Sequence, residues 1–293
     1  MGERRAGGLG GAVAAARRRW RPLDRGWLAY LRYQEVSGPR LAAASAYYGF
    51  FAVFGLALVA YAVLGYLLEY DLDVHVAVDG FLAQNLPWLE PAAIRGSRQR
   101  VGLVGLAGLV ITGVTWIEAI RSAQRLIFGV TEQPGHPVVR WLLDLGVLVA
   151  LLVLLGASLV GAYALEWVLA WLSGGPSPLL TAVSWALAVV VNLILAAALL
   201  GGVPRLRLPA RRLRWPVLLV GIGLTLVNSV GQALVALVRG NAAYSVVAGA
   251  VGVLIYLYVV NQLLLFGAAV AATSAHGEVV DLGTWRRRRP DPH

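Results

Sequence analysis

Three charged residues near the end of an apolar stretch are the first candidates for chemistry. Glu118, Arg121 and Arg125 are three and four residues apart, so a helix carries all of them on one face. Glu118 can pair there with either arginine. Two interpretations fit this pattern: an ion pair that ends a membrane span, and a site at its inner mouth for an anion or a lipid headgroup. The sequence leaves both open.

Uncharged polar residues inside long apolar stretches form a second set of candidates. Such residues either line a polar path through the membrane or fasten neighbouring helices by hydrogen bonds of about 0.6–2 kcal/mol each. Several of them recur at spacings of three and four, which again indicates one helix face. The set consists of Asn192, Thr225, Asn228, Gln232, Tyr258, Asn261 and Gln262.

Catalytic and metal-binding motifs are absent from the sequence. The chain has no cysteine and only four histidines, and these form neither an HExxH pair nor a cluster. Nucleotide-binding glycine loops and the GxSxG elbow are missing too. We therefore expect no catalytic residues, no metal and no cofactor, and we interpret the protein as a non-enzyme.

The composition identifies the surrounding medium as lipid. Of the 293 residues, 59% are hydrophobic and only 14% are charged, against roughly 25% charged residues in a soluble domain. The mean hydropathy is +0.71. These values exclude a disordered chain, a disulfide-rich secreted scaffold and an ordinary soluble enzyme.

Six charge-poor stretches are long enough to cross a bilayer, which takes about 20 apolar residues. The second is the least certain, because Glu118 and Arg121 follow its 17 uncharged residues, 101–117. We predict an all-α, polytopic bundle of six transmembrane helices, at about 41–68, 101–120, 145–171, 179–202, 215–238 and 244–273.

The distribution of arginine predicts the orientation of these spans. All 25 basic residues are arginine, which is typical of a GC-rich bacterial genome. With six spans, 21 of the arginines lie on one side of the membrane and 4 on the other. Basic residues are retained in the cytoplasm. We therefore expect a multi-pass protein of the bacterial plasma (inner) membrane with both termini cytoplasmic.

The segments that flank the six spans are rich in arginine. Leu23, Trp27, Tyr30 and Leu31 recur at helical spacing, which predicts an N-terminal amphipathic helix in the cytoplasmic interface. We expect residues 1–22 to form a disordered tail, 23–275 a single transmembrane domain and 276–293 a second tail. With a net charge of +10, the expected partners are membrane lipids, chiefly anionic ones, and not nucleic acid.

Four stretches resemble the YihY/BrkB family of membrane proteins. They are the Ala-rich start of the first span with its Tyr-Tyr pair (40–48), the end of the second span (119–126), the Arg-Pro-rich loop before the fifth (203–215) and the last span (244–267). Together they cover about residues 25–275 in order. The chain departs from the family pattern where Gly55 stands for a proline, Ala268 and Ala269 for a glutamate, and Ile127 for an asparagine.

The resemblance implies a six-span inner-membrane protein, and it implies no settled mechanism. The family was once labelled ribonuclease BN, but this sequence lacks the grouped metal ligands and the basic cleft that a nuclease needs. A role in envelope lipid traffic is the better match that the resemblance offers. A role that depends on the missing glutamate does not carry over.

Three functions remain as hypotheses. The first is transport or export of a lipid or other amphiphile, since a mostly apolar bundle with scattered amides suits a molecule with a polar head and apolar tails. The second is a non-transporting envelope scaffold or assembly factor, with protein partners or as a homo-oligomer. It predicts that the small-residue stripe of Gly102, Gly105 and Gly108 matters more than the polar residues. An enzyme is the least favoured.

Overall fold

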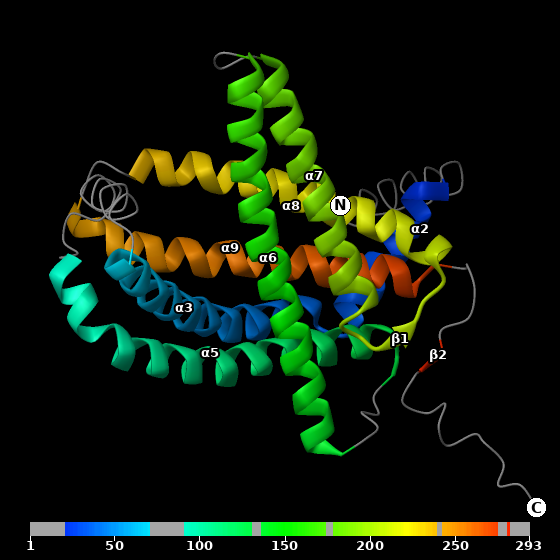
Figure 1. Cartoon of the computed structure of the whole chain (residues 1–293). Coiled ribbons are helices and arrows are strands. Elements are labelled where there is room, and N and C mark those ends of the chain that lie inside the picture. Colours follow the sequence, from blue (N-terminus) through cyan, green and yellow to red (C-terminus); the bar gives the residue numbers. More distant parts are fainter. Residues whose placement is uncertain are drawn as a thin grey trace, which may run out of the picture.

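The computed structural model describes residues 21–70, 91–130, 136–173, 178–238, 242–274 and 280–281. Within these ranges the chain is almost entirely helical (Figure 1). The helices are α2 (Arg21–Glu35), α3 (Gly38–Tyr70), α5 (Pro91–Ile127), α6 (Pro137–Ser173), α7 (Pro178–Gly201), α8 (Ala210–Val238) and α9 (Ala242–Ala272).

Proline and glycine set several helix boundaries. Helices α5, α6 and α7 begin at Pro91, Pro137 and Pro178, and proline suits a first helical position because its missing N–H would have no partner there. Just after α5 the chain turns at Gly129, which has a φ of 75°. This left-handed conformation is a common way to end a helix, and glycine adopts it without strain.

The apolar stretches form membrane-spanning candidates as predicted, with one exception. Five helices in the described residues are long and apolar enough to cross a membrane, including the uncertain second one, Gln99–Ile127. The helix for the fourth predicted span, α7, contributes a described apolar segment of shorter length, Trp185–Gly201. A sixth span and the orientation of the termini therefore stay predictions.

Helices α3 and α5 make the most extensive contact in the molecule (Figure 1). Glycines make this close approach possible. A Cβ added at Gly55 would lie 2.7 Å from the backbone nitrogen of Leu109, and one added at Gly105 would lie 2.6 Å from the Cβ of Leu58. Gly102 likewise faces α3, whereas Gly108 has open space around it. The predicted small-residue stripe is thus a packing surface over two of its three glycines.

The direction of α6 differs from that of the other long helices. In Figure 1, α3, α5, α8 and α9 run along a common direction, and α6 crosses it steeply with α7 beside it. The sequence did not predict this arrangement, because apolar length determines that a helix suits the bilayer and not how it crosses its neighbours.

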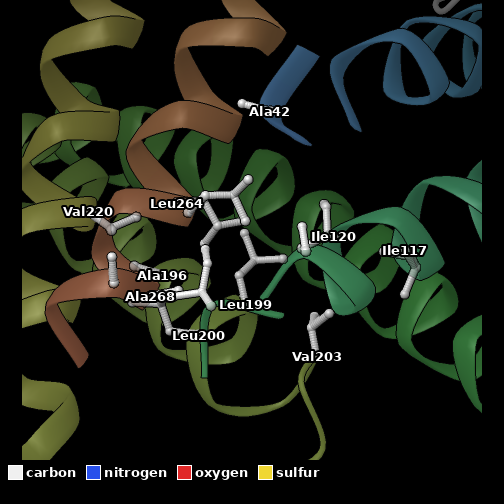
Figure 2. Close-up of a cluster of buried hydrophobic side chains, with 14 of the residues drawn as sticks. Ala42, Ile117, Ile120, Ala196, Leu199, Leu200, Val203, Val220, Leu264 and Ala268 are labelled. Carbon is white, nitrogen blue, oxygen red and sulfur yellow. The ribbon is translucent and has the colours of Figure 1, made fainter. Parts of the chain in front are cut away.

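The hydrophobic core lies where α5, α7, α8 and α9 come together (Figure 2). It contains Ile117 and Ile120 of α5, Leu199 and Leu200 of α7, and Leu264 of α9, all less than 10% exposed. Val220 of α8 and Ala42 of α3 adjoin the same cluster in Figure 2. This core holds together the helix ends that carry the buried charges described below.

Two short strands connect the chain after α9 to the loop before α8. Strand β1 (Leu206–Arg207) pairs antiparallel with β2 (Val280–Asp281), with Leu206 opposite Asp281. Strand β2 falls in the segment predicted as a C-terminal tail. The rest of that tail, residues 1–20 of the N-terminal one and the loop at 71–90 lie outside the described residues.

Candidate functional site

Buried ion pairs join α5, α6 and the α7–α8 loop. Arg121 of α5 is 2% exposed, and its Nη1 lies 2.7 Å from both carboxylate oxygens of Asp144 of α6. Arg205 Nη2 donates to the same carboxylate at 2.6 Å. Glu118 is half-exposed and lies 3.5 Å from Arg121 Nη2. We call the end of the molecule that contains this network the arginine end.

The second arginine of the predicted trio reaches the C-terminal strand. Arg125 Nη2 donates to Asp281 at 2.8 Å, and its Nη1 lies 3.3 Å from the carbonyl oxygen of Pro204. The side chains of Arg125 and Asp281 are 5% and 11% exposed. These two contacts tie α5 to β2 and to the loop that precedes β1.

Other polar side chains at the arginine end cap helix C-termini. Arg212 donates to the carbonyl oxygens of Ala271 and Ala272 at the end of α9, at 2.6 and 2.7 Å. Arg32 of α2 donates to Ile127 and Leu126 at the end of α5, at 2.8 and 3.2 Å. Final carbonyls of a helix lack intrahelical partners and carry partial negative charge. The arginine side chain donates hydrogen bonds to these carbonyls and carries the positive charge that balances them.

Two arginines from other elements bond to Asp144. They are Arg121 of α5 and Arg205 of the α7–α8 loop, and Arg205 also donates to the backbone carbonyl of Arg140. Burial lowers the pKa of Arg205, opposed by the nearby Asp144. For Glu118, Arg121 and Arg125, this geometry agrees with the ion-pair interpretation better than with an open headgroup site.

The predicted polar path divides into two groups with different surroundings. In the first, Asn192 of α7 donates to Thr225 of α8 at 3.0 Å. Tyr256 of α9 donates to Asn228 of α8 at 2.6 Å. These bonds join α7, α8 and α9, as expected for residues that fasten helices. The side chain of Gln232 lies outside the part of the chain whose side chains are described.

The second group consists of Tyr258, Asn261 and Gln262 of α9. Asn261 is 1% exposed, and its amide nitrogen donates to Leu257 O within α9 at 2.8 Å. Its amide oxygen is buried and has no hydrogen-bond partner. Tyr258 packs against the hydrophobic core and lies near Tyr33 of α2. The pKa of Tyr33 is raised to about 12, chiefly by burial of its side chain and to a smaller extent by Tyr258. Gln262 is half-buried.

The Asn261 oxygen is one of six buried polar atoms in the described residues that have no hydrogen bond. The others are the hydroxyls of Tyr33 and Ser45, the indole nitrogen of Trp116, the amide oxygen of Gln124 and the Nε of Arg125. Gln124 and Arg125 bond to neighbouring elements through other atoms. We call Tyr33, Ser45, Trp116 and Asn261 the polar cluster. They come from α2, α3, α5 and α9, and each unsatisfied group costs about 1–3 kcal/mol.

Helix contacts place these four residues along one stretch of α3, from Gly38 to Gly49. The Tyr33 ring occupies the space where a Cβ of Gly38 would lie, and it packs edge-on against Phe266 with centroids 6.0 Å apart. Gly38 of α3 and Phe266 of α9 are thus level, and the two helices pack antiparallel (Figure 1). Seven residues further along α3, about 10 Å, Ser45 is level with the stretch of α9 that holds Tyr258 and Asn261.

Trp116 adjoins the same face of α3. Its indole nitrogen lies 2.9 Å from the position that a Cβ of Gly49 would occupy. Gly49 is one helical turn beyond Ser45, so both lie on one face of α3. The polar cluster therefore follows a single stripe of α3, opposite α9 and α5.

Sequence reasoning singled out Asn261 and did not single out the other three residues of the polar cluster. Ser45 and Tyr33 carry no charge and stand among alanines and aromatics, so nothing in their local pattern distinguishes them from packing residues. A partial signal existed on α2: the predicted stripe of Trp27, Tyr30 and Leu31 is exposed in the structure, and Ala29 and Tyr33 form its opposite, buried face. Within the described residues, no group of three His, Cys, Asp or Glu side chains could hold a metal ion.

Comparison with known proteins decides the family. A profile of the family described as Virulence factor BrkB matches residues 29–292. The chain belongs to the BrkB family. This BrkB-family chain is 24% identical to the inner membrane protein YhjD of Escherichia coli (strain K12), over 84% of its own length and 79% of the relative's.

A second relative is an uncharacterized protein of Dickeya dadantii (strain 3937). It is 27% identical to this BrkB-family chain, over 83% of the chain and 80% of the relative. No solved structure matches the chain. The family match, the inner-membrane relative and the apolar helices together identify a multi-pass inner-membrane protein.

Proposed function

We propose that this BrkB-family protein moves a lipid or another amphiphile across or out of the inner membrane. The polar cluster is the observation that carries the proposal. Four side chains present hydrogen-bonding atoms without partners inside an otherwise apolar bundle. A polar group of a passing molecule would satisfy these atoms, and the apolar helix surfaces would accommodate its acyl chains.

The position of α2 supports the same proposal. On one side α2 exposes Trp27, Leu28 and Leu31, and on the other it covers the polar cluster with Tyr33. A helix with an exposed aromatic and apolar side lies in the interface between headgroups and acyl chains. Such a helix would separate the lipid leaflet from the polar cluster.

Lipid movement between leaflets tests the proposal. The protein would be reconstituted in vesicles with labelled lipids of several headgroups, and label in the outer leaflet would be quenched chemically over time. We expect faster loss of the protected fraction than in protein-free vesicles, and slower loss with Asn261→Leu than with Thr225→Val, whose site is outside the polar cluster. Equal rates with and without protein, for every headgroup, would contradict transport.

A non-transporting scaffold or assembly factor is the second candidate. The bonds Asn192–Thr225 and Asn228–Tyr256 and the buried pair Arg121–Asp144 favour it, because each joins helices and presents nothing to a substrate. A scaffold predicts no lipid movement in vesicles and copurification of an envelope protein or a second copy of the chain. The Arg-rich tails fit contact with anionic lipids under either function.

A further inference from the structure

The ion pair between Arg125 and Asp281 has the geometry of an anion site whose anion is supplied by the chain itself. Arg125 Nη2 lies 2.8 Å from one carboxylate oxygen of Asp281, and Nη1 lies 3.3 Å from the other. Arginine binds carboxylates and phosphates alike in this bidentate manner. The Arg125 side chain is only 5% exposed. If Asp281 leaves, a buried cation loses this counter-charge, which is costly unless another anion takes its place.

Positive charge is concentrated around this pair. Burial lowers the pKa of Arg205, and against the opposing Asp144 three nearby guanidinium groups lower it further. These groups belong to Arg121, Arg125 and Arg140. The described residues place three carboxylates against these arginines, those of Glu118, Asp144 and Asp281. Loss of Asp281 would therefore leave a strongly cationic site at the arginine end.

Of the two buried carboxylates, that of Asp281 is the easier one to remove. Asp144 belongs to the long helix α6, is 3% exposed and is bonded by two arginines. Asp281 belongs to β2, which pairs with β1 over only two residues, Leu206 with Asp281 and Arg207 with Val280. A pair of strands this short has little stability of its own in water. Strand β2 can thus detach without unfolding a helix.

The location of Arg125 brings it close to lipid headgroups. Arg125 lies in the last turn of α5, at the end of the candidate span Gln99–Ile127, and the ends of a span lie at the level of the headgroups. In the sequence, the arginines 286–289 begin five residues after Asp281. Each basic residue near an anionic membrane surface gains about 1 kcal/mol. An anionic membrane therefore attracts the segment that carries β2 and offers phosphate groups to Arg125.

We propose that Arg125 is a binding site for the phosphate group of an anionic lipid headgroup, and that Asp281 on β2 occupies this site in the closed state seen here. Strand and lipid then compete for one guanidinium group. The two interpretations of Arg125, ion pair and headgroup site, become the closed and the open state of one site. This proposal does not depend on the transport proposed above.

A disulfide between β1 and β2 tests the competition in the full-length protein. Arg207 and Val280 are paired in the register. The Cα atoms of such antiparallel partners are about 4.5–5.5 Å apart, which a disulfide can span. The variant Arg207→Cys/Val280→Cys therefore holds β2 in place when oxidised and leaves it free to detach when reduced. The chain has no cysteine of its own that would interfere.

Native mass spectrometry of the purified variant would count bound phosphatidylglycerol, with phosphatidylcholine of the same acyl chains as the reference. We expect the reduced protein to bind phosphatidylglycerol about tenfold more tightly than the oxidised protein, because only the reduced form can offer Arg125 for a charge-assisted bidentate contact. Phosphatidylcholine, whose phosphate carries its own counter-charge, should bind both forms alike.

Two variants that each remove one negative charge at the arginine end form a matched pair. Asp281→Asn removes the competing carboxylate and should tighten phosphatidylglycerol binding about tenfold. Glu118→Gln leaves Arg121 bonded to Asp144 and should not change it. The double variant Arg125→Gln/Asp281→Asn should bind as weakly as the oxidised disulfide variant. Thermal melting would show whether each variant folds, and if Asp281→Asn does not, the disulfide variant carries the test.

Three results would overturn the proposal. The first is equal binding of phosphatidylglycerol by the oxidised and reduced forms. The second is equal tightening by Asp281→Asn and Glu118→Gln, which would indicate a general effect of charge. The third is displacement of the lipid by inorganic phosphate at equal concentration, which would identify free phosphate as the ligand. None of these measurements involves movement of lipid between leaflets, so a failure of the proposed transport is distinguishable from a failure of this site.

Discussion

At the scale of single residues, arginine has two structural uses in this protein. Arg121 and Arg205 neutralise one buried carboxylate, and Arg32 and Arg212 each bond two carbonyl oxygens at a helix end. The second use needs several N–H groups in a fixed planar fork, which lysine does not have. The arginines that the sequence predicts on one side of the membrane thus also join the helices that end near them.

The carboxylate of Asp144 should contribute far more to the free energy of unfolding than the carboxylate of Glu118. Asp144→Asn leaves Arg121 buried with its main counter-charge removed, and breaking a buried pair costs about 3–5 kcal/mol. Glu118→Gln removes an exposed partner, for which about 0–1 kcal/mol is expected. Thermal midpoints of the two variants in one detergent would check this, and equal midpoints would show that the buried network contributes little.

Alkaline pH should reveal the burial of Tyr33. Its pKa is raised to about 12 in the folded protein, against about 10 in the unfolded chain. The folded protein therefore favours the protonated Tyr33, and this contribution to the free energy of unfolding is complete below pH 10. It is lost as pH rises from the unfolded pKa to the folded pKa, at roughly 1.4 kcal/mol per pH unit. Tyr33→Phe lacks this loss, so its stability relative to wild type should rise between pH 9 and 11. A constant difference over that range would contradict the assignment.

Spacing along one helix predicted which residues share a face, and it failed to predict partners on other helices. Thr225 and Asn228, which spacing grouped, bond to α7 and to α9 respectively. Spacing did not predict that Asp144 bonds to Arg121 and Arg205, because it identifies only partners on the same helix. Ser45 went unnoticed because its significance depends on α9 being opposite, which is a property of the assembled bundle.

At the scale of helices, the apolar runs predicted α3, α5, α6, α8 and α9 as spans, because the thickness of the bilayer fixes the length that a sequence must supply. The helices extend beyond the predicted spans, and α5 begins at Pro91 rather than near residue 101. Helical structure continues into the interface as long as its backbone groups are bonded, whereas hydropathy records only the apolar part.

Two glycines on α5 should respond in opposite ways to the same substitution. A Cβ at Gly105 would lie 3.0 Å from the backbone nitrogen of Val59, whereas a Cβ at Gly108 meets nothing within 4 Å. Gly105→Ala should therefore cost about 1–3 kcal/mol by forcing α3 and α5 apart. Gly108→Ala should be neutral or stabilising by up to about 1 kcal/mol, since alanine favours the helix.

The measurement for this pair is the thermal midpoint of the purified variants in detergent. Equal shifts for the two variants would mean that α3 and α5 do not approach through Gly105. Interhelical cross-linking offers an independent readout, because the chain contains no cysteine of its own that would interfere with an engineered pair.

At the scale of the whole molecule, the arginine end gathers the ends of α5, α7 and α9 and the starts of α6 and α8. Such alternation is what a chain that crosses a membrane repeatedly must produce. The sequence predicted from its arginines which helix ends lie on the same side of the membrane. It did not predict that α6 runs at a steep angle to the direction of α3 and α9 (Figure 1). The crossing direction depends on how side chains of different helices interlock.

Reporter fusions should place both termini in the cytoplasm. The prediction follows from the 21 arginines on one side of six spans. A cytoplasmic fluorescent reporter should be active at either end, and a periplasmic phosphatase reporter at neither. Activity of the two reporters at opposite ends would require an odd number of spans and would exclude α7 as a crossing helix.

The ion pair between Arg125 and Asp281 has a consequence for biogenesis. The ribosome delivers Arg125 to the membrane 156 residues before Asp281, so α5 must insert while the carboxylate that later neutralises it has not been synthesised. This connection forms only after residue 281 has been synthesised. A nascent chain that stops before Asp281 thus lacks the carboxylate that pairs with the buried Arg125 side chain.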